Sequence, residues 1–349
     1  MVGLLAKRPS IELLQKAKAY RPKFAVTFDT PDKDWLTLIN NYSIFIQGEE
    51  GLAAIIEESD KVLNAVSGLA GIKPALRALE KKKILLACNK ESIVFLEDII
   101  RKKINLVIPV DSEHNALFFL LKTLNKRFVD KLILTASGGP FKNLPVEKFS
   151  EITPEQALRH PTWQMGPKVS IDCATLMNKG IEILEAKILF GCEPDNIEVI
   201  IHPQSFVHAG VKLEDGSYIL YAANPTMKLP LLHALFYPEV PNCQLEETAN
   251  RLVGSMSFEE PNEDKFPALK LCRWIAKAGG AYPPALIGAD QKALELFLQG
   301  MIKFNAIVPL VEEVINLLNS KPPETEEETL EIVSWGYIKA EELAQKFAV

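Results

Sequence analysis

Two carboxylates follow directly on an apolar segment near the end of the first third of the chain. Asp111 and Glu113 come after Asn105–Val110, a run with the composition of a buried strand. In extended chain, residues two apart face the same way, so both side chains can converge on one point. Converging carboxylates repel unless a cation or proton lies between them, and such oxygen ligands suit magnesium or manganese. An equally weighted alternative is that both acids favour the N-terminus of a following helix.

A third carboxylate lies in the segment Asn178–Glu182. If this segment is helical, Asn178 and Glu182 stand one turn apart on one face, with Lys179 beside Glu182 at the three-residue spacing. A carboxylate would then lie next to amide and ammonium donors of the kind that hold a phosphate. The alternative is an ordinary solvated helix face, which is the usual meaning of an isolated Lys/Glu pair.

Three further segments have the residue types of ligand-binding loops. Ser137–Pro140 ends a strand with a hydroxyl and two glycines, whose backbone can approach an anion closely. Asn89–Ser92 follows another strand, where the turn can hold a ligand or Asn89 can cap a helix. Arg159–Gly166 contains Trp163 in a polar, proline-interrupted stretch, which indicates either a lid over a ligand or a loop anchored to the core.

The elements that must position these residues are those of an α/β protein. Short apolar runs alternate with amphipathic stretches, the pattern of βαβ units and a parallel, Rossmann-like sheet. Strands are expected at 2–6, 24–28, 43–47, 84–88, 105–110 and 132–137, and helices at 11–20, 53–58, 92–103 and 115–124. Residues 198–223 predict an antiparallel hairpin around the turn 214–216. From about Phe266 the pattern is helical, and the loop Lys321–Glu328 is expected to precede a last helix.

These patterns divide the chain into three expected domains. Residues 1–110 form the Rossmann-like domain, and residues 111–255 form an α+β domain that carries most of the candidate site residues. Residues 256–349 form a linker and a helical C-terminal domain. In open parallel sheets ligands bind beyond the carboxyl ends of the strands, which is where the candidate segments lie.

Composition excludes several classes of protein. The 349 residues carry a net charge of −6 without a long basic stripe, so no nucleic-acid partner is expected. No apolar run approaches the ~20 residues that span a bilayer, and Lys7 and Arg8 interrupt the apolar start where a signal peptide would continue. The five cysteines form no CxxC pair, which indicates reduced thiols. We therefore expect a cytoplasmic protein without a membrane partner.

Six segments can be compared with known families as an ordered set. They are NKES (89–92), PVDSEHNA (109–116), SGGPF (137–141), HPTWQMG (160–166), MNKGIE (177–182) and IHPQSFVH (201–208). In order and spacing they resemble the signature segments of the 1-deoxy-D-xylulose 5-phosphate reductoisomerase family. The resemblance implies a homodimeric enzyme of isoprenoid biosynthesis by the methylerythritol phosphate route. It would isomerise 1-deoxy-D-xylulose 5-phosphate, a small sugar phosphate, and reduce it to 2-C-methyl-D-erythritol 4-phosphate with NADPH and Mn²⁺ or Mg²⁺.

The resemblance also implies a role for each matching residue. Asp111, Glu113 and Glu182 would hold the metal, and Lys90, Glu113 and His160 would be catalytic. The residues implied in substrate binding are Lys90, Ser112, Glu113, Ser137, His160, Trp163, Cys173, Asn178, Lys179 and Glu182. The residues implied in NADPH binding are Lys7, Arg8, Asn89, Glu91 and Gly166.

The chain departs from the family pattern at its N-terminus. The family begins with a strand and a GxTGxIG-type turn that holds the NADPH pyrophosphate at a helix N-terminus. Here Met1 falls at the expected second strand, so the first strand and the glycine-rich turn are expected to be missing and NADPH to bind poorly. Lys7-Arg8-Pro9 stands where a Gly-Lys/Arg-Asn turn is usual, and its charges still suit the 2′-phosphate.

Three internal positions depart as well. Cys173 stands in place of a phosphate-binding serine, Asn224–Lys228 in place of a GxPDMR-like segment, and Gly288–Gln291 where an Asn-Ala-Ala-Asn-Glu segment is usual. Two hypotheses follow: an active reductoisomerase, or a catalytically impaired homologue that binds metal or sugar phosphate without dinucleotide-dependent turnover. Retention of all three carboxylates favours the first, because clustered acids cost stability when they serve no site.

Overall fold

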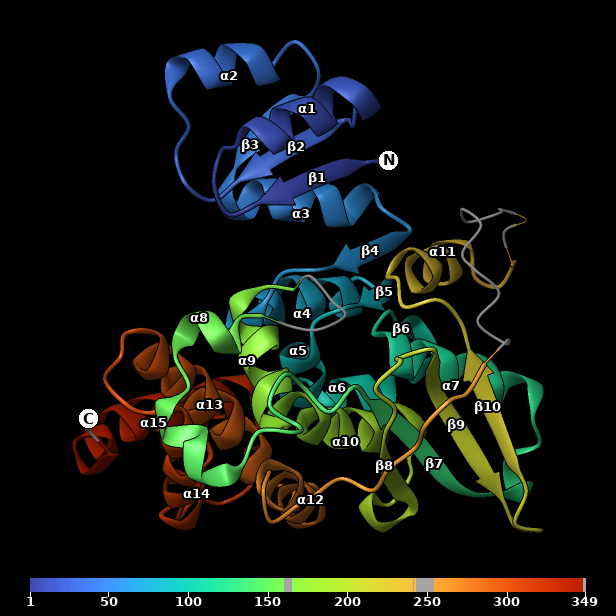
Figure 1. Cartoon of the computed structure of the whole chain (residues 1–349). Helices are drawn as coiled ribbons and strands as arrows, with labels where there is room; N and C mark the ends of the chain where they lie inside the picture. The colour runs from blue at the N-terminus through green and yellow to red at the C-terminus, as the bar shows by residue number, and fades with distance from the viewer. Residues whose placement is uncertain (160–164, 241, 243–253, 348–349) are drawn as a thin grey trace.

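The structure is a computed structural model that describes residues 1–159, 165–240, 242 and 254–347. An N-terminal layer of strands and helices lies above the body of the molecule, in which the C-terminal helices and the mixed sheet occupy opposite sides (Figure 1). His160 and Trp163, which the sequence assigned to the substrate, lie outside the described residues. Across the part of the chain that is described, no helix combines the length and apolar character needed to cross a bilayer.

The strands of the described residues form three sheets, ordered β1-β2-β3, β4-β5-β6 and β10-β9-β7-β8. The first two sheets are wholly parallel, whereas in the third β7 runs parallel to β8 and antiparallel to β9. The bounds are β1 (Gly3–Ala6), β2 (Phe24–Thr27), β3 (Ile44–Gln47), β4 (Lys61–Asn64), β5 (Ile84–Ala87), β6 (Val107–Pro109), β7 (Val129–Ala136), β8 (Ile197–Ile201), β9 (Val207–Leu213) and β10 (Tyr218–Ala222).

Helices connect these strands and make up the C-terminal region. From the N-terminus to the end of the second sheet they are α1 (Ile11–Tyr20), α2 (Lys33–Ile39), α3 (Gly48–Glu58), α4 (Ile72–Glu80), α5 (Lys90–Phe95) and α6 (Glu97–Lys102). Beyond it they are α7 (Ser112–Thr123), α8 (Pro154–Ala157), α9 (Pro167–Thr175), α10 (Met177–Phe190), α11 (Lys228–Phe236), α12 (Ala268–Ala278), α13 (Tyr282–Leu298), α14 (Ile307–Asn316) and α15 (Glu326–Leu343).

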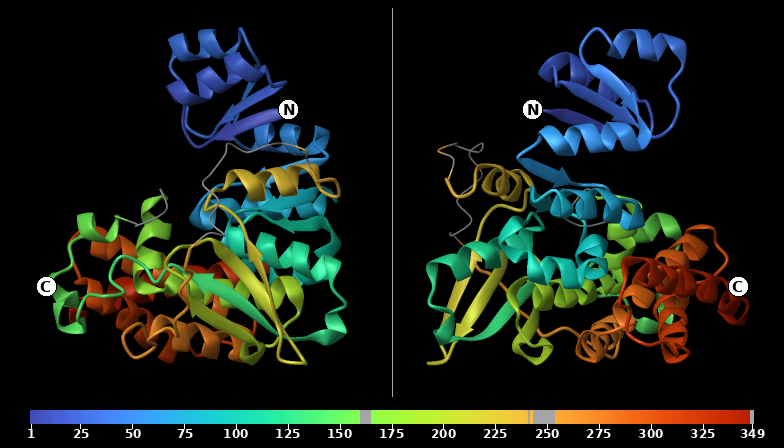
Figure 2. Two further views of the ribbon diagram at one scale, coloured as in Figure 1. Left: turned by 45° about the vertical axis from the view of Figure 1, so that its right-hand side comes forward. Right: turned by 180° about the vertical axis from the view of Figure 1, so that it is seen from behind.

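The N-terminal sheet has helices on both faces. Leu13 and Ala17 of α1, and Trp35 and Ile39 of α2, are buried together with Ala25 of β2 in one apolar core. The helix α3 lies on the other side of the sheet, toward the body of the molecule (Figures 1 and 2). The central strand β2 is wholly buried and β1 and β3 are partly exposed, and the apolar runs of the sequence predicted all three strands correctly. The expected Rossmann-like sheet is confirmed.

The second sheet brings two candidate segments to one edge. In its register Ala87 of β5 pairs with Pro109 of β6, so both strands end at the same level. The chain continues from β5 into Lys90 and from β6 into Asp111, and these side chains therefore start from neighbouring strand ends. This is the edge at which ligands bind in parallel sheets.

The single helix predicted for residues 92–103 is wrong, because the chain forms two short helices there. Helix α5 ends at Phe95, its C-cap residue Leu96 has a φ of −95° and a ψ of 25° outside the helical region, and α6 starts at Glu97. Glu97 and Asp98 occupy the first turn of α6, where acidic side chains favour a new N-terminus. The apolar period continues through the break, which is why the pattern alone did not reveal it.

The third sheet contains the predicted hairpin. Strands β9 and β10 pair antiparallel, and Gly216 at the turn between them has a φ of 85°, which glycine adopts without steric cost. Strand β7 lies between β9 and β8 and ends at Ala136, directly before the predicted anion loop. The sheet therefore holds the loop that begins at Ser137 against the helices α9 and α10.

The C-terminal region is helical, as predicted, although its last helix begins earlier than expected. The loop was expected to extend to Glu328, but α15 starts at Glu326. Thr325 accepts a hydrogen bond from the backbone of Glu328, and the Glu328 side chain accepts one from the backbone of Thr325. This capping box fixes the helix start within the acidic run. The domain boundaries at residues 110 and 255 stay predictions.

Two glycines explain how α13 and α15 pack. A Cβ at Gly288 would lie 1.9 Å from the backbone oxygen of Val333, and one at Gly336 would lie 2.4 Å from that of Ala285. The helices therefore cross with their backbones in contact, which only glycine permits at both positions. The first residue of the unusual segment Gly288–Gln291 thus serves packing of the C-terminal helices.

Candidate active site

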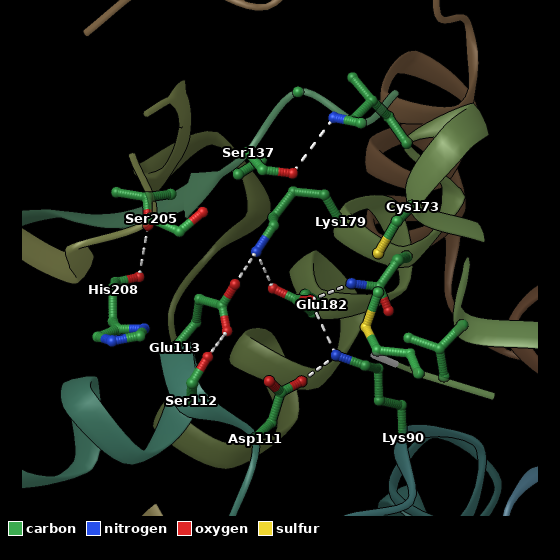
Figure 3. Close-up of a pocket in the computed structure, with 18 of the residues that line it drawn as sticks. Lys90, Asp111, Ser112, Glu113, Ser137, Cys173, Lys179, Glu182, Ser205 and His208 are labelled. Atoms are coloured by element: carbon green, nitrogen blue, oxygen red, sulfur yellow. Dashed lines mark hydrogen bonds and ion pairs between the residues drawn. The ribbon is translucent and has the colours of Figure 1, made fainter. Parts of the chain in front are cut away.

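One pocket of about 240 Å³ collects most of the predicted site residues. Its walls are the start of α7, the loop after β7, the helices α9 and α10, and strand β9 (Figure 3). The predicted residues that line it are Lys90, Asp111, Ser112, Glu113, Ser137, Cys173, Asn178, Lys179 and Glu182. The fold thus brings together segments that are far apart in the sequence.

Lys90 lies between two of the three candidate metal carboxylates. Its ammonium group forms an ion pair with Asp111 Oδ2 and lies 2.8 Å from Glu182 Oε1 (Figure 3). Asn178 Nδ2 donates to the same oxygen of Glu182 at 2.6 Å. The Glu182 side chain is 1% exposed and that of Lys90 13%, so the charges interact in a medium of low dielectric. Loss of one partner would leave a buried charge uncompensated.

Lys179 connects the third carboxylate to this group. Its Nζ lies 2.6 Å from Glu113 Oε1 and also pairs with Glu182 Oε2. The extended-chain argument for Asp111 and Glu113 is wrong, because α7 begins at Ser112 and puts Glu113 in its first turn. Asp111 holds the N-cap position without a side-chain capping bond, since its carboxylate is paired with Lys90 instead.

The electrostatic balance of the pocket favours a further cation. Burial alone would raise the pKa of Asp111, but the positive charges of Lys90, His114 and Lys179 together outweigh it and hold that pKa well below its usual range. The pKa of Glu182 is raised, first by burial and then by the Glu113 carboxylate. Burial lowers the pKa of Lys90 and Lys179, but the surrounding carboxylates more than reverse this and keep both protonated. With Glu185 and a charged His114 included, four carboxyl groups face three cationic groups, and this imbalance attracts a cation.

The donor set is chemically suited to a divalent ion. Asp111 and Glu182 each offer a carboxylate oxygen within 4.8 Å of the other, and His114 offers a ring nitrogen at the same distance only when its ring is neutral. Carboxylate oxygens are the ligands that Mg²⁺ and Mn²⁺ prefer. The ammonium of Lys90 provides positive charge between Asp111 and Glu182 in the same way as a cation would. Glu113 joins them through Lys179, so one network contains all three predicted carboxylates.

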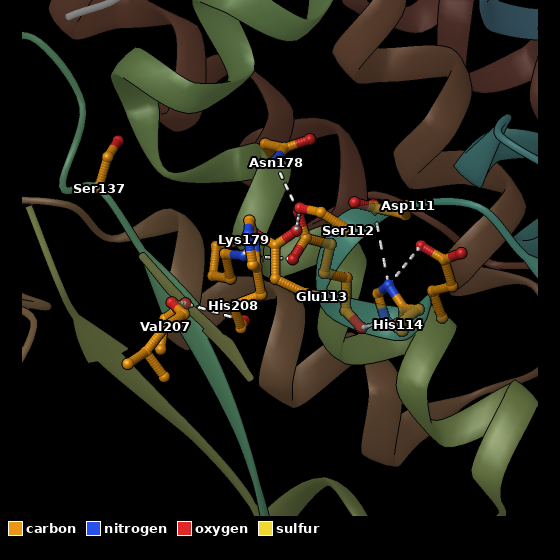
Figure 4. Close-up of polar contacts among 12 residues, drawn as sticks. Asp111, Ser112, Glu113, His114, Ser137, Asn178, Lys179, Val207 and His208 are labelled. Atoms are coloured by element: carbon orange, nitrogen blue, oxygen red, sulfur yellow. Dashed lines mark hydrogen bonds and ion pairs between the residues drawn. The ribbon is translucent and has the colours of Figure 1, made fainter. Parts of the chain in front are cut away.

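His114 contacts this network through Asp111 and Glu182, and no role was assigned to it from the sequence. Its Nδ1 lies 3.3 Å from Glu185 Oε2 and 3.7 Å from Asp111 Oδ2, as ion pairs without hydrogen-bond alignment (Figure 4). Its Nε2 lies 3.1 Å from the backbone oxygen of Glu182. Burial disfavours the charged ring, but the carboxylates of Glu185 and Asp111 raise the pKa of His114 to about 9. A charged His114 therefore holds Asp111 in place.

The loop after β7 requires its two glycines. Gly138 and Gly139 have φ of 90° and 69°, and a Cβ at Gly139 would lie 2.6 Å from the backbone oxygen of Cys173. The Ser137 hydroxyl accepts a hydrogen bond from the Gly139 N–H at 3.3 Å. The left-handed backbone thus brings the loop close to α9, in the arrangement that offers backbone donors to an anion.

A left-handed residue joins the two helices on the other side of the pocket. Leu176 has a φ of 60° and lies at the end of α9 and the start of α10. This conformation costs roughly 1–2 kcal/mol for a residue with a Cβ. The resulting turn directs Cys173 from α9 and Asn178 and Lys179 from α10 to the same pocket. Burial raises the pKa of the Cys173 thiol, which therefore stays neutral and is a weak donor.

Asn89 acts as a helix cap in this structure. Its Oδ1 accepts a hydrogen bond from the Ser92 N–H at 2.5 Å, at the start of α5. Its Nδ2 donates to the backbone oxygens of Val66 and Gly68 at 2.6 and 2.9 Å. The sequence left two alternatives for this turn, a ligand-binding role and a helix-capping role, and these contacts are those of a helix cap.

The other residues predicted to bind NADPH also lie outside the lining of the pocket. Glu91 is buried and its Oε1 lies 3.3 Å from Lys168 Nζ. Gly166 is the N-cap residue of α9. Lys7 and Arg8 are exposed and follow β1 in the N-terminal layer. Their cofactor roles stay predictions.

The pocket also contains residues to which the sequence assigned no function. Ser205 and His208 line it on the β9 side, and Met227 lines it from the unusual segment Asn224–Lys228. Burial lowers the pKa of His208, so its ring is neutral near pH 7. The sequence could have indicated both residues, because Ser205 and His208 belong to IHPQSFVH, one of the six segments that resemble the family.

The fold and the pocket together define an α/β enzyme with candidate sites for a divalent cation and a phosphorylated substrate. Comparison with known families agrees over most of the chain. Residues 1–96 match 1-deoxy-D-xylulose 5-phosphate reductoisomerase, residues 107–190 match the 1-deoxy-D-xylulose 5-phosphate reductoisomerase C-terminal domain, and residues 222–337 match the DXP reductoisomerase C-terminal domain.

Individual relatives give the same result. The chain is 47% identical over 346 residues to the 1-deoxy-D-xylulose 5-phosphate reductoisomerase of Aquifex aeolicus (strain VF5), covering 99% of this chain and 91% of that one. It is 40% identical over 354 residues to that of Thermomicrobium roseum (strain ATCC 27502 / DSM 5159 / P-2), covering 98% and 90%. This chain belongs to the 1-deoxy-D-xylulose 5-phosphate reductoisomerase family, as the sequence predicted.

Solved structures of the family are also similar to this one. The enzyme from Zymomonas mobilis in complex with NADPH has a TM-score of 0.90 at 32% identity, covering 99% of this chain and 91% of that chain. A DOX-P reductoisomerase in complex with NADPH, fosmidomycin and magnesium has a TM-score of 0.88 at 32% identity, covering 99% and 90%. These comparisons support the active-enzyme hypothesis and give no support to an impaired homologue.

Proposed function

We propose that this protein is an active NADPH-dependent reductoisomerase. It converts 1-deoxy-D-xylulose 5-phosphate to 2-C-methyl-D-erythritol 4-phosphate in isoprenoid biosynthesis, with the help of Mg²⁺ or Mn²⁺. The observation that carries the proposal is the pocket in which three carboxylates, two buried lysines and a serine–glycine loop face one another, in a chain of this family.

Asp111, Glu113 and Glu182 are the residues proposed to hold the divalent cation. When bound, the cation supplies positive charge that polarises the ketone and a neighbouring hydroxyl of the substrate. In the structure the same carboxylates are paired with Lys90 and Lys179. Once the carboxylates have another positive partner, both ammonium groups can donate to the substrate instead.

The substrate phosphate is proposed to bind between α10 and the loop after β7. Lys179 provides a full positive charge there, and Asn178 and Ser137 provide neutral donors from two sides of the pocket (Figure 4). A dianionic phosphate requires several donors and at least one cation, which this set supplies. Cys173 completes the same wall with a thiol.

Lys90 and Glu113 are proposed to act on the carbon skeleton. The isomerisation breaks the bond between C3 and C4 of the substrate and forms one between C2 and C4, so a hydroxyl proton must leave and a carbonyl oxygen must be stabilised. Lys90 is protonated and can donate, while Ser112 and Glu113 line the same side of the pocket. His160 and Trp163 keep their proposed contacts with the substrate and lie outside the described residues.

NADPH is proposed as the hydride donor that reduces the aldehyde formed by isomerisation. Lys7 and Arg8 carry positive charge at the end of β1, where it suits the 2′-phosphate. Asn89, Glu91 and Gly166 are proposed to lie near the nicotinamide, because each adjoins or closely precedes a residue of the pocket wall in the sequence. The solved relative that contains NADPH supports this cofactor.

A spectrophotometric assay tests the proposal. Purified protein with 1-deoxy-D-xylulose 5-phosphate and MnCl₂ or MgCl₂ is expected to consume NADPH, and chelation of the metal is expected to stop the reaction. Because a similar structure contains fosmidomycin, we also expect this compound to inhibit. A folded, metal-supplied protein that leaves NADPH unchanged would contradict the proposed function.

A homodimer in the cytoplasm completes the proposal. β10 is an edge strand whose alternate side chains Tyr218 and Leu220 are 55% and 43% exposed, a surface that suits a second copy of the chain. Light scattering is expected to give twice the monomer mass, and the double variant Tyr218→Glu, Leu220→Lys is expected to shift the measured mass toward that of the monomer.

We also propose three domains, at residues 1–110, 111–255 and 256–349.

A further inference from the structure

A second buried cluster of charges lies behind the pocket wall. Lys168 Nζ lies 2.7 Å from Asp172 Oδ2, 2.7 Å from Asp290 Oδ2 and 3.3 Å from Glu91 Oε1. The Lys168 side chain is 14% exposed, and those of Asp172 and Asp290 are 5% and 1% exposed. We call these four residues the Lys168 cluster. Burying three carboxylates with one ammonium group is unfavourable unless the arrangement is held by the rest of the structure.

Helix stability does not explain why Lys168 stands where it does. It is the second residue of α9, directly after Pro167. A cation in the first turn opposes the helix dipole and costs about 0.3–1 kcal/mol. The three carboxylates that surround the ammonium group offset this cost. Contact with other elements is therefore the reason for a lysine at this position.

The Lys168 cluster joins three separate parts of the chain. Glu91 belongs to α5, which follows the strand β5. Lys168 and Asp172 stand one turn apart on α9. Asp290 belongs to α13, the central helix of the C-terminal region. A single ammonium group thus connects the helix after the second sheet, the pocket helix α9 and the C-terminal helices.

Three members of the cluster adjoin pocket residues in the sequence. Glu91, Lys168 and Asp172 are each followed or preceded directly by a residue that lines the pocket. These neighbours are Lys90, Val169 and Cys173. Successive residues of a helix point ~100° apart, so α9 presents one side to the cluster and an adjacent side to the pocket. Any rotation or slide of α9 that breaks the cluster would also move the pocket wall.

We infer that Lys168 is a positioning residue for the reductoisomerase reaction: with Glu91, Asp172 and Asp290 it locks α5 and α9 onto α13, and so fixes Lys90 opposite the wall formed by Val169 and Cys173. The inference rests on the proposed function. Lys168 is not among the residues that line the pocket, so it acts through its neighbours and not by contact with the substrate. The reacting group that it positions most directly is Lys90.

Steady-state kinetics and thermal unfolding of a variant series test this inference. Lys168→Met is expected to lower kcat at least tenfold, to change the KM for the sugar phosphate less than fivefold, and to lower the melting temperature. Lys168→Arg is expected to recover most of kcat, because a guanidinium can pair with the same carboxylates. The triple variant Lys168→Met, Asp172→Asn, Asp290→Asn removes the ammonium group and two of its three acidic partners and leaves Glu91 in place. It is expected to regain melting temperature but not kcat.

Lys292→Met is the matched control, because Lys292 lies on α13 with Asp290, is not among the pocket-lining residues, and has its Nζ 2.8 Å from Glu341 Oε1. Its kcat is expected to stay within twofold of wild type. Wild-type kcat in Lys168→Met, or recovery of kcat in the triple variant, would overturn the inference and leave a merely structural cluster. If Lys168→Met does not fold, Asp290→Asn provides the test of the inference. We expect this variant to lose kcat threefold at unchanged melting temperature. An unchanged kcat would overturn the inference. Inactive wild-type protein would instead refute the proposed function.

Discussion

The molecule contains two buried groups of lysines and acidic side chains, one of which lines the pocket. In the pocket, Lys90 and Lys179 face Asp111, Glu113 and Glu182. In the Lys168 cluster, one ammonium group faces three carboxylates. Both have more negative than positive charges, and in both the side chains are largely withdrawn from water. By residue type alone either could be taken for a metal site.

The difference between them is what can neutralise the excess charge. The pocket group borders a cavity of about 240 Å³, so its lysines can be replaced as partners by a metal ion or a substrate. The Lys168 cluster lies outside the lining of that pocket and takes up a proton instead. Burial and the Asp290 carboxylate raise the pKa of Asp172 to about 8, which leaves it protonated near neutral pH. The two groups have similar composition and similar exposure, so the bordering cavity is what distinguishes the reaction site from the Lys168 cluster.

The largest expected effect comes from breaking the pocket group at its centre. Glu182→Gln removes the carboxylate that pairs with both Lys90 and Lys179. We expect kcat to fall at least a thousandfold, about 4 kcal/mol of transition-state stabilisation, and calorimetry to show no tight Mn²⁺ binding. The control Glu198→Gln removes a half-exposed partner of Lys131 and is expected to change neither. Wild-type Mn²⁺ affinity in Glu182→Gln would rule out the metal role.

The second-largest expected effect distinguishes substrate binding from catalysis by the pocket group. Lys179→Met removes the positive charge proposed for the phosphate, and a charge-assisted hydrogen bond of about 2–3 kcal/mol corresponds to a 30- to 150-fold rise in KM. The control Lys187→Met lies on the same helix, where the side chain donates to the backbone oxygen of Ala276. It should leave KM unchanged. A fall in kcat at constant KM would move Lys179 from the phosphate to the reacting centre.

We expect the proton held in the Lys168 cluster to make the free energy of unfolding depend on pH. Asp172 keeps its proton up to about pH 8 when folded, against an ordinary value of 3.8, so the folded state binds more protons between these values. Its contribution therefore makes the free energy of unfolding fall as pH rises, by about 1 kcal/mol per pH unit. Asp290→Asn removes one cause of the raised pKa. The remaining charged or titratable neighbours are Lys168, Glu91, Cys173 and Cys272.

Urea unfolding at pH 6, 7 and 8 measures this effect. We expect the loss of stability over this range to be smaller in Asp290→Asn than in wild type, by about 1 kcal/mol. Two curves that run parallel would show that no proton is held by the pair Asp172 and Asp290.

The smallest expected effect concerns the unusual thiol in the pocket wall. Cys173→Ser replaces a weak donor with a hydroxyl of similar size, so the KM for the sugar phosphate should fall two- to fivefold, which is less than about 1 kcal/mol. Cys192→Ser, distant from the pocket lining, serves as the control. An unchanged or higher KM would show that Cys173 does not contact the phosphate.

Local patterns were sufficient to predict most of the elements. Apolar runs and helical periods gave the parallel strands, the β9–β10 hairpin and the helical C-terminus, because burial against a neighbouring layer depends on the spacing of apolar residues along the chain. Eight of the nine predicted residues that line the pocket belong to the six family segments, and the ninth, Cys173, lies outside them. The pattern was not sufficient where a helix-start signal lies inside a loop pattern or inside a continuous apolar period. It placed the start of α15 too late and missed the break at Leu96.

Partners and distances were decided by the tertiary structure alone. The sequence predicted that Asp111, Glu113 and Glu182 belong together, but not that Lys90 and Lys179 lie between them, or that Glu113 reaches them from the first turn of a helix. It also treated Gly288–Gln291 only as a departure, although Asp290 is a partner of Lys168 across 122 positions. Side-chain spacing along one element follows from its period, whereas contacts between elements depend on how several helices and strands pack at once.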